Sequence, residues 1–240
     1  MDTLPPPSPT APVDSAPPSP SVIDRETVAV AALGARLIGT VDAVVAGKHD
    51  AVEIGVATLL AGGHLLIEDL PGVGKTLLAQ VLARSVGGTF HRIQGTSDLL
   101  PGDITGSMVP GGQLDVDSMR FRPGPVFANV VVFDELNRAT PRTQSALLEL
   151  AEEATVTVDG VSHRLPDPFL LVATQNPIDI AGTYGLGEGA LDRFHAVVTP
   201  GRASPSAEVE VLTGRRGRSM LDAVEPVTSL GGLAQARTTV

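Results

Sequence analysis

The stretch EDLPGVGKT, at residues 68–76, has the residue types that a phosphate-binding loop requires. Backbone N–H groups from Gly72 through Thr76 can converge on phosphate oxygens, and the helix that follows adds the positive end of its dipole. Lys75 is placed to meet the β- and γ-phosphates of a nucleotide, and the Thr76 hydroxyl to bind Mg²⁺. The alternative, a structural glycine turn before a helix, is less favoured because an apolar strand precedes the loop.

Asp69 departs from the usual loop pattern G-x-x-x-x-G-K-[ST], in which a glycine occupies this position. A carboxylate that faced bound phosphates would repel them. We therefore expect the side chain of Asp69 to point outward. The groups that hold phosphate then lie downstream of it.

Further polar residues follow apolar runs and could complete a hydrolytic site. Asp134 and Glu135 end the run VVVFDE; the first could hold Mg²⁺ through water, and the second could orient and polarise an attacking water. Asn176 ends the run LVATQN and could hydrogen-bond that water or the γ-phosphate, although a lone Asn is more often a turn residue. Arg193 could neutralise charge in the transition state, but its spacing alone favours a solvated salt bridge.

Short apolar runs bounded by turn residues alternate with helical segments after residue 63. Each run suits a strand buried on both faces, and the alternation predicts an α/β fold with a mostly parallel sheet between helices. The expected strands lie at residues 64–68, 90–93, 129–135, 169–176 and 195–200. The expected helices lie at residues 24–47, 50–60, 75–86, 141–153 and 187–193, with Asp24 and Thr140 as possible N-caps.

Two segments break this alternation and predict β-hairpins. One has Asp159 and Gly160 between alternating residues, which is a strong signal for a tight turn. The other, SMVPGGQLDVDSMRF, has Gly111 and Gly112 at its tip.

Composition limits the possible partners and location of the chain. Its 240 residues include 17 basic and 27 acidic ones, and the formal net charge of -10 argues against a broad nucleic-acid surface. The run GRRGR at residues 214–218 is interpreted as a solvated turn. There are no cysteines, and the five histidines lack metal-ligand spacing.

No apolar stretch reaches the roughly 20 residues of a membrane span, and the N-terminus lacks the features of a signal peptide. Residues 1–23 are rich in Pro, Ser and Ala and predict a disordered tail. We expect a cytoplasmic protein.

With these residues in order, the chain from about Asp24 onward resembles the MoxR family of AAA+ ATPases, a clade of P-loop NTPases with an insert in helix 2. The motifs that carry the resemblance are LLAGGHLLIEDLPGVGKTLLA, RIQGTSDLLPGDITG, FRPGPVFANVVVFDELNRATPRTQSALLELAEE, VTVDG, LVATQNPID and GALDRF. The hairpin at about 104–122 is similar to the family's insert, and AGK at 46–48 is similar to the stretch near adenine.

The resemblance implies a three-layer P-loop fold that binds ATP with Mg²⁺, forms hexameric rings, and remodels or activates partner proteins, often ones with von Willebrand factor A domains. Lys75 and Thr76 match the Walker A residues, Asp134 and Glu135 match Walker B, and Asn176 matches sensor 1. Arg193 matches the arginine finger offered to a neighbouring subunit. The implied catalytic set is Lys75, Glu135, Asn176 and Arg193; Mg²⁺ would be held by Thr76 and Asp134. The implied nucleotide-binding set is Pro71, Gly72, Val73, Gly74, Lys75, Thr76, Leu77 and Asp134.

The expected organisation is a tail at 1–23, an AAA+ core at 24–218, and the start of an incomplete helical lid at 219–240. Family members have prolines where this chain has Gly185 and Gly187, so we expect a more mobile loop before Arg193. The leading hypothesis is ATP hydrolysis with chaperone-like remodelling of partners. The alternative is a nucleotide-dependent binding module with little turnover, and a P-loop kinase is the weakest candidate.

Overall fold

The computed structural model describes residues 20–68, 74–110, 119–178 and 182–239. The strands are β1 (Leu65–Glu68), β2 (Phe90–Gln94), β3 (Gly106–Pro110), β4 (Met119–Pro123), β5 (Val130–Asp134), β6 (Thr155–Val158), β7 (Val161–Arg164), β8 (Leu170–Gln175) and β9 (Ala196–Val198). The α-helices are α1 (Pro20–Asp42), α2 (His49–Leu60), α3 (Lys75–Ser85), α4 (Pro101–Thr105), α5 (Pro141–Glu153), α6 (Glu188–Leu191), α7 (Pro205–Leu212) and α8 (Leu230–Thr239). Two 3₁₀ helices are η1 (Leu136–Arg138) and η2 (Arg218–Ala223).

The main sheet has five strands in the order β2-β5-β8-β1-β9, and all of its neighbours pair in parallel. Parallel strands end at the same edge, so the residues that follow β5 and β8 lie close together. The predicted mostly parallel sheet is confirmed. This edge is where the candidate site forms.

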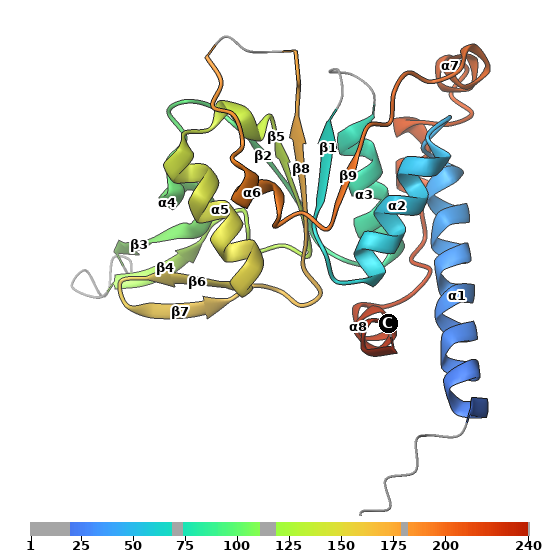
Figure 1. Cartoon of the computed structure of the whole chain (residues 1–240), viewed down its shortest axis with the longest axis horizontal. Helices are drawn as coiled ribbons and strands as arrows, with labels where there is room; N and C mark the ends of the chain where they lie inside the picture. Colours follow the sequence, from blue (N-terminus) through green and yellow to red (C-terminus); the bar gives the residue numbers. More distant parts are fainter. Residues whose placement is uncertain (1–19, 69–73, 111–118, 179–181, 240) are drawn as a thin grey trace, which may run out of the picture.

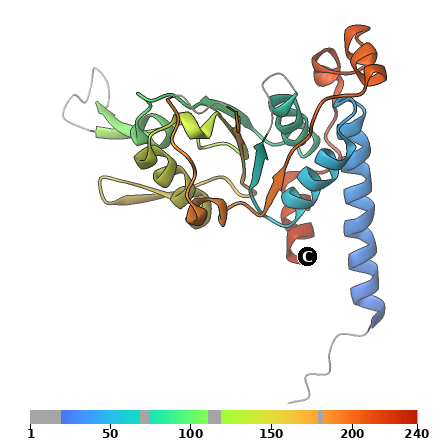
Figure 2. The ribbon, with the colours of Figure 1, turned by 45° about the horizontal axis from the view of Figure 1, so that its top comes forward.

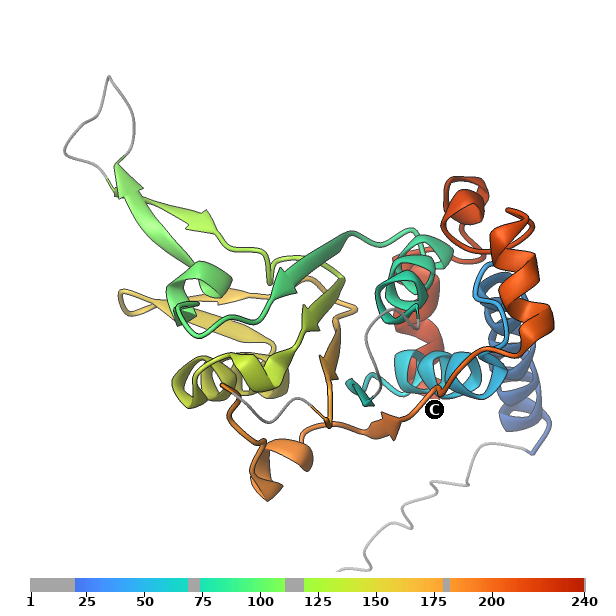
Figure 3. The same ribbon diagram turned by 90° about the horizontal axis from the view of Figure 1, so that it is seen from above.

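Helices cover both faces of the sheet, which gives three layers (Figure 1). Successive side chains of a strand point to opposite faces. Leu65 and Ile67 therefore pack in one core with α1, α2 and α3, while Leu66 packs in a second core with α5. Figure 3 shows the same division from above, with α5 and α3 on opposite sides of the sheet.

Both predicted hairpins are present as separate antiparallel pairs, β3 with β4 and β6 with β7. Asp159 and Gly160 form the second turn, both with positive φ (47° and 79°), as a tight hairpin turn requires. The tip with Gly111 and Gly112 lies outside the described residues. The hairpins lie at the end of the molecule opposite α1 (Figure 2).

Helix ends follow the expected chemistry in two cases. The Thr140 side chain accepts a hydrogen bond from the Thr143 N–H (3.4 Å), and Pro141 begins α5. At the end of α2, Gly62 has φ +72° and the Gly63 N–H reaches the Thr58 carbonyl (3.0 Å), a Schellman-type ending.

Two expectations about the elements are wrong. α1 begins at Pro20, so Asp24 is inside the helix rather than its N-cap, and the expected tail overlaps the helix at residues 20–23. Residues 1–19 lie outside the described part. β2 and β9 are not buried on both faces, because they form the two edges of the sheet; only Ile93 of β2 and Val198 of β9 are buried.

The segment after α7 packs against the first core. Leu233 and Ala236 of α8 are buried with residues of α1 and α2, and the Arg237 Nε donates to the Leu59 carbonyl (2.9 Å). The assignment of residues 219–240 to a lid stays a prediction. Within the described ranges, no helix combines the length and apolar character needed to cross a bilayer.

Candidate functional site

A polar cavity of about 350 Å³ lies at the carboxyl-end edge of the sheet, beside the start of α3. Its lining residues are Gly74, Lys75, Thr76, Leu77, Gln80, Arg92, Gln94, Asp134, Glu135, Thr174, Asn176 and Arg218. The structure thus brings together most of the side chains that the sequence predicts for a hydrolytic site.

The described part of the predicted phosphate loop begins at Gly74. This residue is the N-cap of α3 with φ 90° and ψ 14°, a left-handed conformation that glycine adopts without strain. Its carbonyl accepts the Leu78 N–H (3.0 Å), so α3 starts immediately after it and Lys75 and Thr76 occupy its first turn. The predicted site residues Pro71, Gly72 and Val73, and also Asp69, lie outside the described residues.

Asp134 lies at the end of β5 and its carboxylate accepts hydrogen bonds from several sides. Thr174 Oγ1 donates to Oδ1 (3.2 Å), Thr76 Oγ1 to Oδ2 (3.4 Å), and Arg92 Nε pairs with Oδ2 (2.5 Å). A hydroxyl and a carboxylate at this separation are the hard oxygen ligands that Mg²⁺ prefers, so Thr76 and Asp134 fit the predicted ion. Arg92 pairs with the carboxylate that would hold the ion.

Glu135 has a left-handed backbone conformation, with φ 56°, which is uncommon for a residue other than glycine. Its N–H donates to Thr174 Oγ1 (3.0 Å), and its carbonyl accepts the Arg138 N–H (2.9 Å). The carboxylate Oε2 accepts from Gln94 Nε2 (2.9 Å) and pairs with Arg138 Nε (3.1 Å). The acid that would activate water is thus held by two donors.

Asn176 lines the same cavity, one residue after β8 ends. Its Oδ1 accepts the Ile178 N–H (3.1 Å), which is the local turn contact that the sequence left open as an alternative. The side chain therefore forms a turn and also faces the site.

Arg193 lies outside this cavity. It follows α6, its Nε pairs with Glu152 Oε2 of α5 (2.9 Å), and its Nη1 donates to the Gly189 carbonyl. The salt bridge that its spacing favoured is therefore present. Within one subunit the structure does not bring Arg193 to Asp134 and Glu135.

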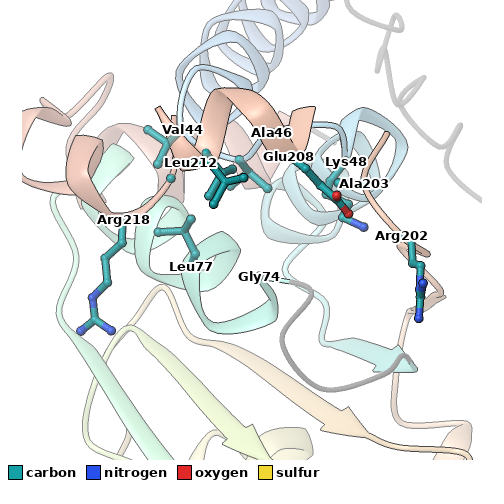
Figure 4. Close-up of a pocket in the computed structure, with 13 residues that line it drawn as sticks. Val44, Ala46, Lys48, Gly74, Leu77, Arg202, Ala203, Glu208, Leu212 and Arg218 are labelled. Carbon is teal, nitrogen blue, oxygen red and sulfur yellow. The ribbon is translucent and has the colours of Figure 1, made fainter. Parts of the chain in front are cut away.

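A second, more apolar cavity of about 440 Å³ adjoins the first and shares Gly74, Leu77 and Arg218 with it. Figure 4 shows Val44, Ala46, Leu77 and Leu212 gathered in it. The Lys48 ammonium of the predicted adenine stretch also lines it and donates to the Pro200 carbonyl (3.4 Å). The paired cavities suit a ligand with an apolar ring at one end and a charged group at the other.

Sequence reasoning missed several residues of the site. Thr174 is a buried polar residue within an apolar strand, and Arg92 and Gln94 alternate on β2. These polar positions near strand ends could have indicated that the three side chains line the site. The Gly95 N–H donates a hydrogen bond to the Asp134 carbonyl (2.7 Å). Arg218 is the last residue of the run GRRGR, which was interpreted as a solvated turn, so it was not predicted to line the site.

The fold and the site define a three-layer α/β protein of the P-loop class. The sequence profile of the "ATPase family associated with various cellular activities (AAA)" matches residues 64–196. A protein named Chaperone MoxR1 from Mycobacterium tuberculosis is 44% identical over 178 residues, which cover 74% of this chain and 46% of that protein. The uncharacterized protein YeaC of Bacillus subtilis is 46% identical over 187 residues, 78% of this chain and 58% of the relative.

The fold comparison agrees with these relatives. A solved structure of a protein proposed to be an ATPase, from Cytophaga hutchinsonii, has a TM-score of 0.80 and 32% identity, with 91% of this chain and 66% of that one covered. The chain belongs to the MoxR family of AAA+ ATPases. It spans about half the length of the curated relatives named above.

Proposed function

We propose that this chain binds ATP and hydrolyses it with Mg²⁺, and that hydrolysis drives chaperone-like remodelling or activation of partner proteins. The observation that carries the proposal is the convergence of Thr76, Asp134 and Glu135 on one polar cavity at the start of α3. The adjoining apolar cavity would take the adenine ring. The name Chaperone MoxR1, given to a relative 44% identical to this chain, supports the second half of the proposal.

Each residue has a defined part in the proposed reaction. Lys75 and the N–H groups at the start of α3 bind the phosphates, and Thr76 and Asp134 hold Mg²⁺, which would neutralise charge on them. Glu135 accepts a proton from, or orients, the water that attacks the γ-phosphate, and Asn176 positions that water or a phosphate oxygen. Thr174 positions Asp134 and the Glu135 backbone through its hydroxyl.

Assembly and location are further parts of the proposal. We infer a homo-oligomeric ring, a hexamer as in the family, in which Arg193 reaches the site of a neighbouring subunit. Three further proposals also extend the resemblance. They are partners with von Willebrand factor A domains, a cytoplasmic location, and a division into a core at 24–218 and a lid from 219. Exposed apolar side chains on α7, including Val209 and Leu212, leave surface for a contact with another chain.

One set of variants tests the enzyme. ATP turnover and ATP binding are measured for the wild type, Lys75→Ala and Glu135→Gln, with Glu149→Gln on the exposed face of α5 as the control. Glu135→Gln should lower turnover by about 10²- to 10⁴-fold with binding retained, because it removes a general base. Lys75→Ala should weaken nucleotide binding. Turnover that is the same in all of these proteins would refute the hydrolysis proposal.

A nucleotide-dependent binding module is the second candidate, and one observation favours it. Arg92 pairs with Asp134, while Gln94 and Arg138 both hold Glu135, so neither acid is free to act in this conformation. This candidate would be supported over the enzyme by two results together. The wild type would bind ATP and Lys75→Ala would not, and Glu135→Gln would not lower the turnover measured for the wild type.

A further inference from the structure

Arg218 is a cation at the nucleotide site that the proposed chemistry does not use. It is the first residue of η2, and it lines both the polar and the apolar cavity. The other residues common to both cavities, Gly74 and Leu77, belong to the start of α3. Arg218 therefore lies where the two cavities meet, from a segment far from the loop in sequence.

The position of Arg218 is fixed by contacts on both sides of it. The Gly217 N–H donates to the Val44 carbonyl (2.8 Å), and Gly217 has φ 98°, which favours glycine. Arg84 of α3 donates to the Leu221 carbonyl (2.8 Å) and pairs with Asp222 (2.8 Å). Because α3 also carries Lys75, η2 is attached to the same helix that begins at the phosphate loop.

The charge of Arg218 is uncompensated within the described part of the chain. Two other arginines near it have acidic partners. Arg92, which lines the polar cavity, pairs with Asp134, and Arg216, two residues earlier in the sequence, pairs with Glu210. No hydrogen bond or ion pair joins the Arg218 side chain to any described residue, although Glu208 also lines the apolar cavity. In Figure 4 the guanidinium points away from Val44 and Leu212 at the end of an extended side chain.

We propose that Arg218 binds the phosphate groups of a nucleoside di- or triphosphate and makes the site require phosphates on the nucleoside. A guanidinium offers several N–H donors in a fixed plane and pairs well with phosphate oxygens. Lys75, the first residue of α3, lines the polar cavity together with Arg218, so the phosphates would have one cation from α3 and one from η2. This inference rests on the proposed nucleotide-binding function.

The test measures affinity with a defined probe. Binding of N-methylanthraniloyl-ADP is followed by fluorescence anisotropy with Mg²⁺, and unlabelled ATP, ADP and adenosine are used to displace it. The proteins are the wild type, Arg218→Ala, Arg218→Gln, Arg218→Lys and Lys75→Ala. Arg215→Ala is the matched control, because Arg215 is an exposed arginine of the same basic run and lines neither cavity.

Arg218→Ala and Arg218→Gln should weaken ATP and ADP about tenfold, the loss expected for one charge-assisted hydrogen bond, and leave adenosine unchanged. Arg218→Lys should recover part of the affinity, and Arg215→Ala should bind as the wild type does. Thermal unfolding checks that each variant is folded; Arg218→Gln keeps most of the side-chain length if the alanine variant is unstable.

Two results would overturn the inference. One is ATP and ADP affinity within twofold of the wild type in Arg218→Gln; the other is an equal loss for adenosine, which would indicate a change in cavity shape. If the wild type itself binds no better than Lys75→Ala, the proposed function fails. If Lys75→Ala alone loses binding, only the inference on Arg218 fails.

Discussion

At the scale of single residues, the two acids of the site depend on neighbours that do no chemistry themselves. Thr174 receives the Glu135 N–H and donates to Asp134, so one hydroxyl orients consecutive residues. Gly95 approaches the same pair from β2: a Cβ built on it would lie 2.3 Å from the Glu135 carbonyl oxygen and 3.0 Å from that of Asp134. Only a residue without a side chain fits there.

Gly95→Ala should therefore lower both stability and turnover. The new methyl group would meet backbone atoms that cannot rotate away, and overpacking of this kind costs about 1–3 kcal/mol. Urea unfolding and ATP turnover measure the two effects. Gly102→Ala in α4 is the control, because nothing lies within 4 Å of its Cβ position. A Gly95→Ala protein as stable and active as this control would show that β2 can move away without cost.

At the scale of elements, His64 ties three parts of the fold together just before β1. Its Nε2 donates to the Ala151 carbonyl of α5 (2.9 Å), and its Nδ1 accepts the Leu171 N–H of β8 (3.2 Å). Its own N–H donates to His195 Nδ1 before β9 (3.2 Å). Burial lowers the pKa of His64, and His195 and Arg237 add to this effect.

The sign of the pH effect follows from this lowered pKa. Below the unfolded pKa of about 6.5, the unfolded chain binds a proton that the folded chain resists, so the free energy of unfolding should fall from pH 7.5 to 5.5. The slope that His64 can add is at most about 1.4 kcal/mol per pH unit. His64→Asn, which keeps an acceptor side chain, should be less stable at pH 7.5 but flatten this slope in urea unfolding.

His49→Gln is the control with the opposite sign. Asp42 raises the pKa of the exposed His49, so its contribution is present at low pH and lost as pH rises. Removing it should steepen the loss of stability on acidification. A His64→Asn protein with the wild-type slope would assign the pH dependence to other groups.

At the scale of the whole molecule, the residues proposed for catalysis lie at two separate positions within one subunit. Lys75, Glu135 and Asn176 line one cavity, whereas Arg193 pairs with Glu152 away from it. A ring in which each subunit offers Arg193 to its neighbour would join them. Turnover per subunit should then rise with protein concentration.

Arg193→Ala should lower turnover by about 10³-fold or more and leave ATP binding intact, because an arginine finger acts on the transition state. Mixing it with Lys75→Ala should restore part of the activity, since each variant supplies what the other lacks. Arg142→Ala, an exposed arginine on α5, is the control. Mixtures no more active than the separate variants would place the action of Arg193 within its own subunit or outside catalysis.

The sequence by itself determined the parallel sheet, both hairpins, the helix after Thr140 and some of the residues that line the cavity, namely Lys75, Thr76, Asp134, Glu135 and Asn176. These features depend on local signals: apolar runs, turn residues, caps and polar residues at strand ends. It placed the start of α1 wrongly, because Asp24 is a good N-cap by type but the helix continues back to Pro20.

Only the tertiary structure decided that β2 is an edge strand, that Arg92 and Gln94 hold the two acids, and that Arg218 lies at the boundary of the cavities. These facts depend on contacts between residues far apart in the chain. Arg84 brings η2 onto α3 across 138 positions, and nothing in the local pattern of either segment encodes that distance.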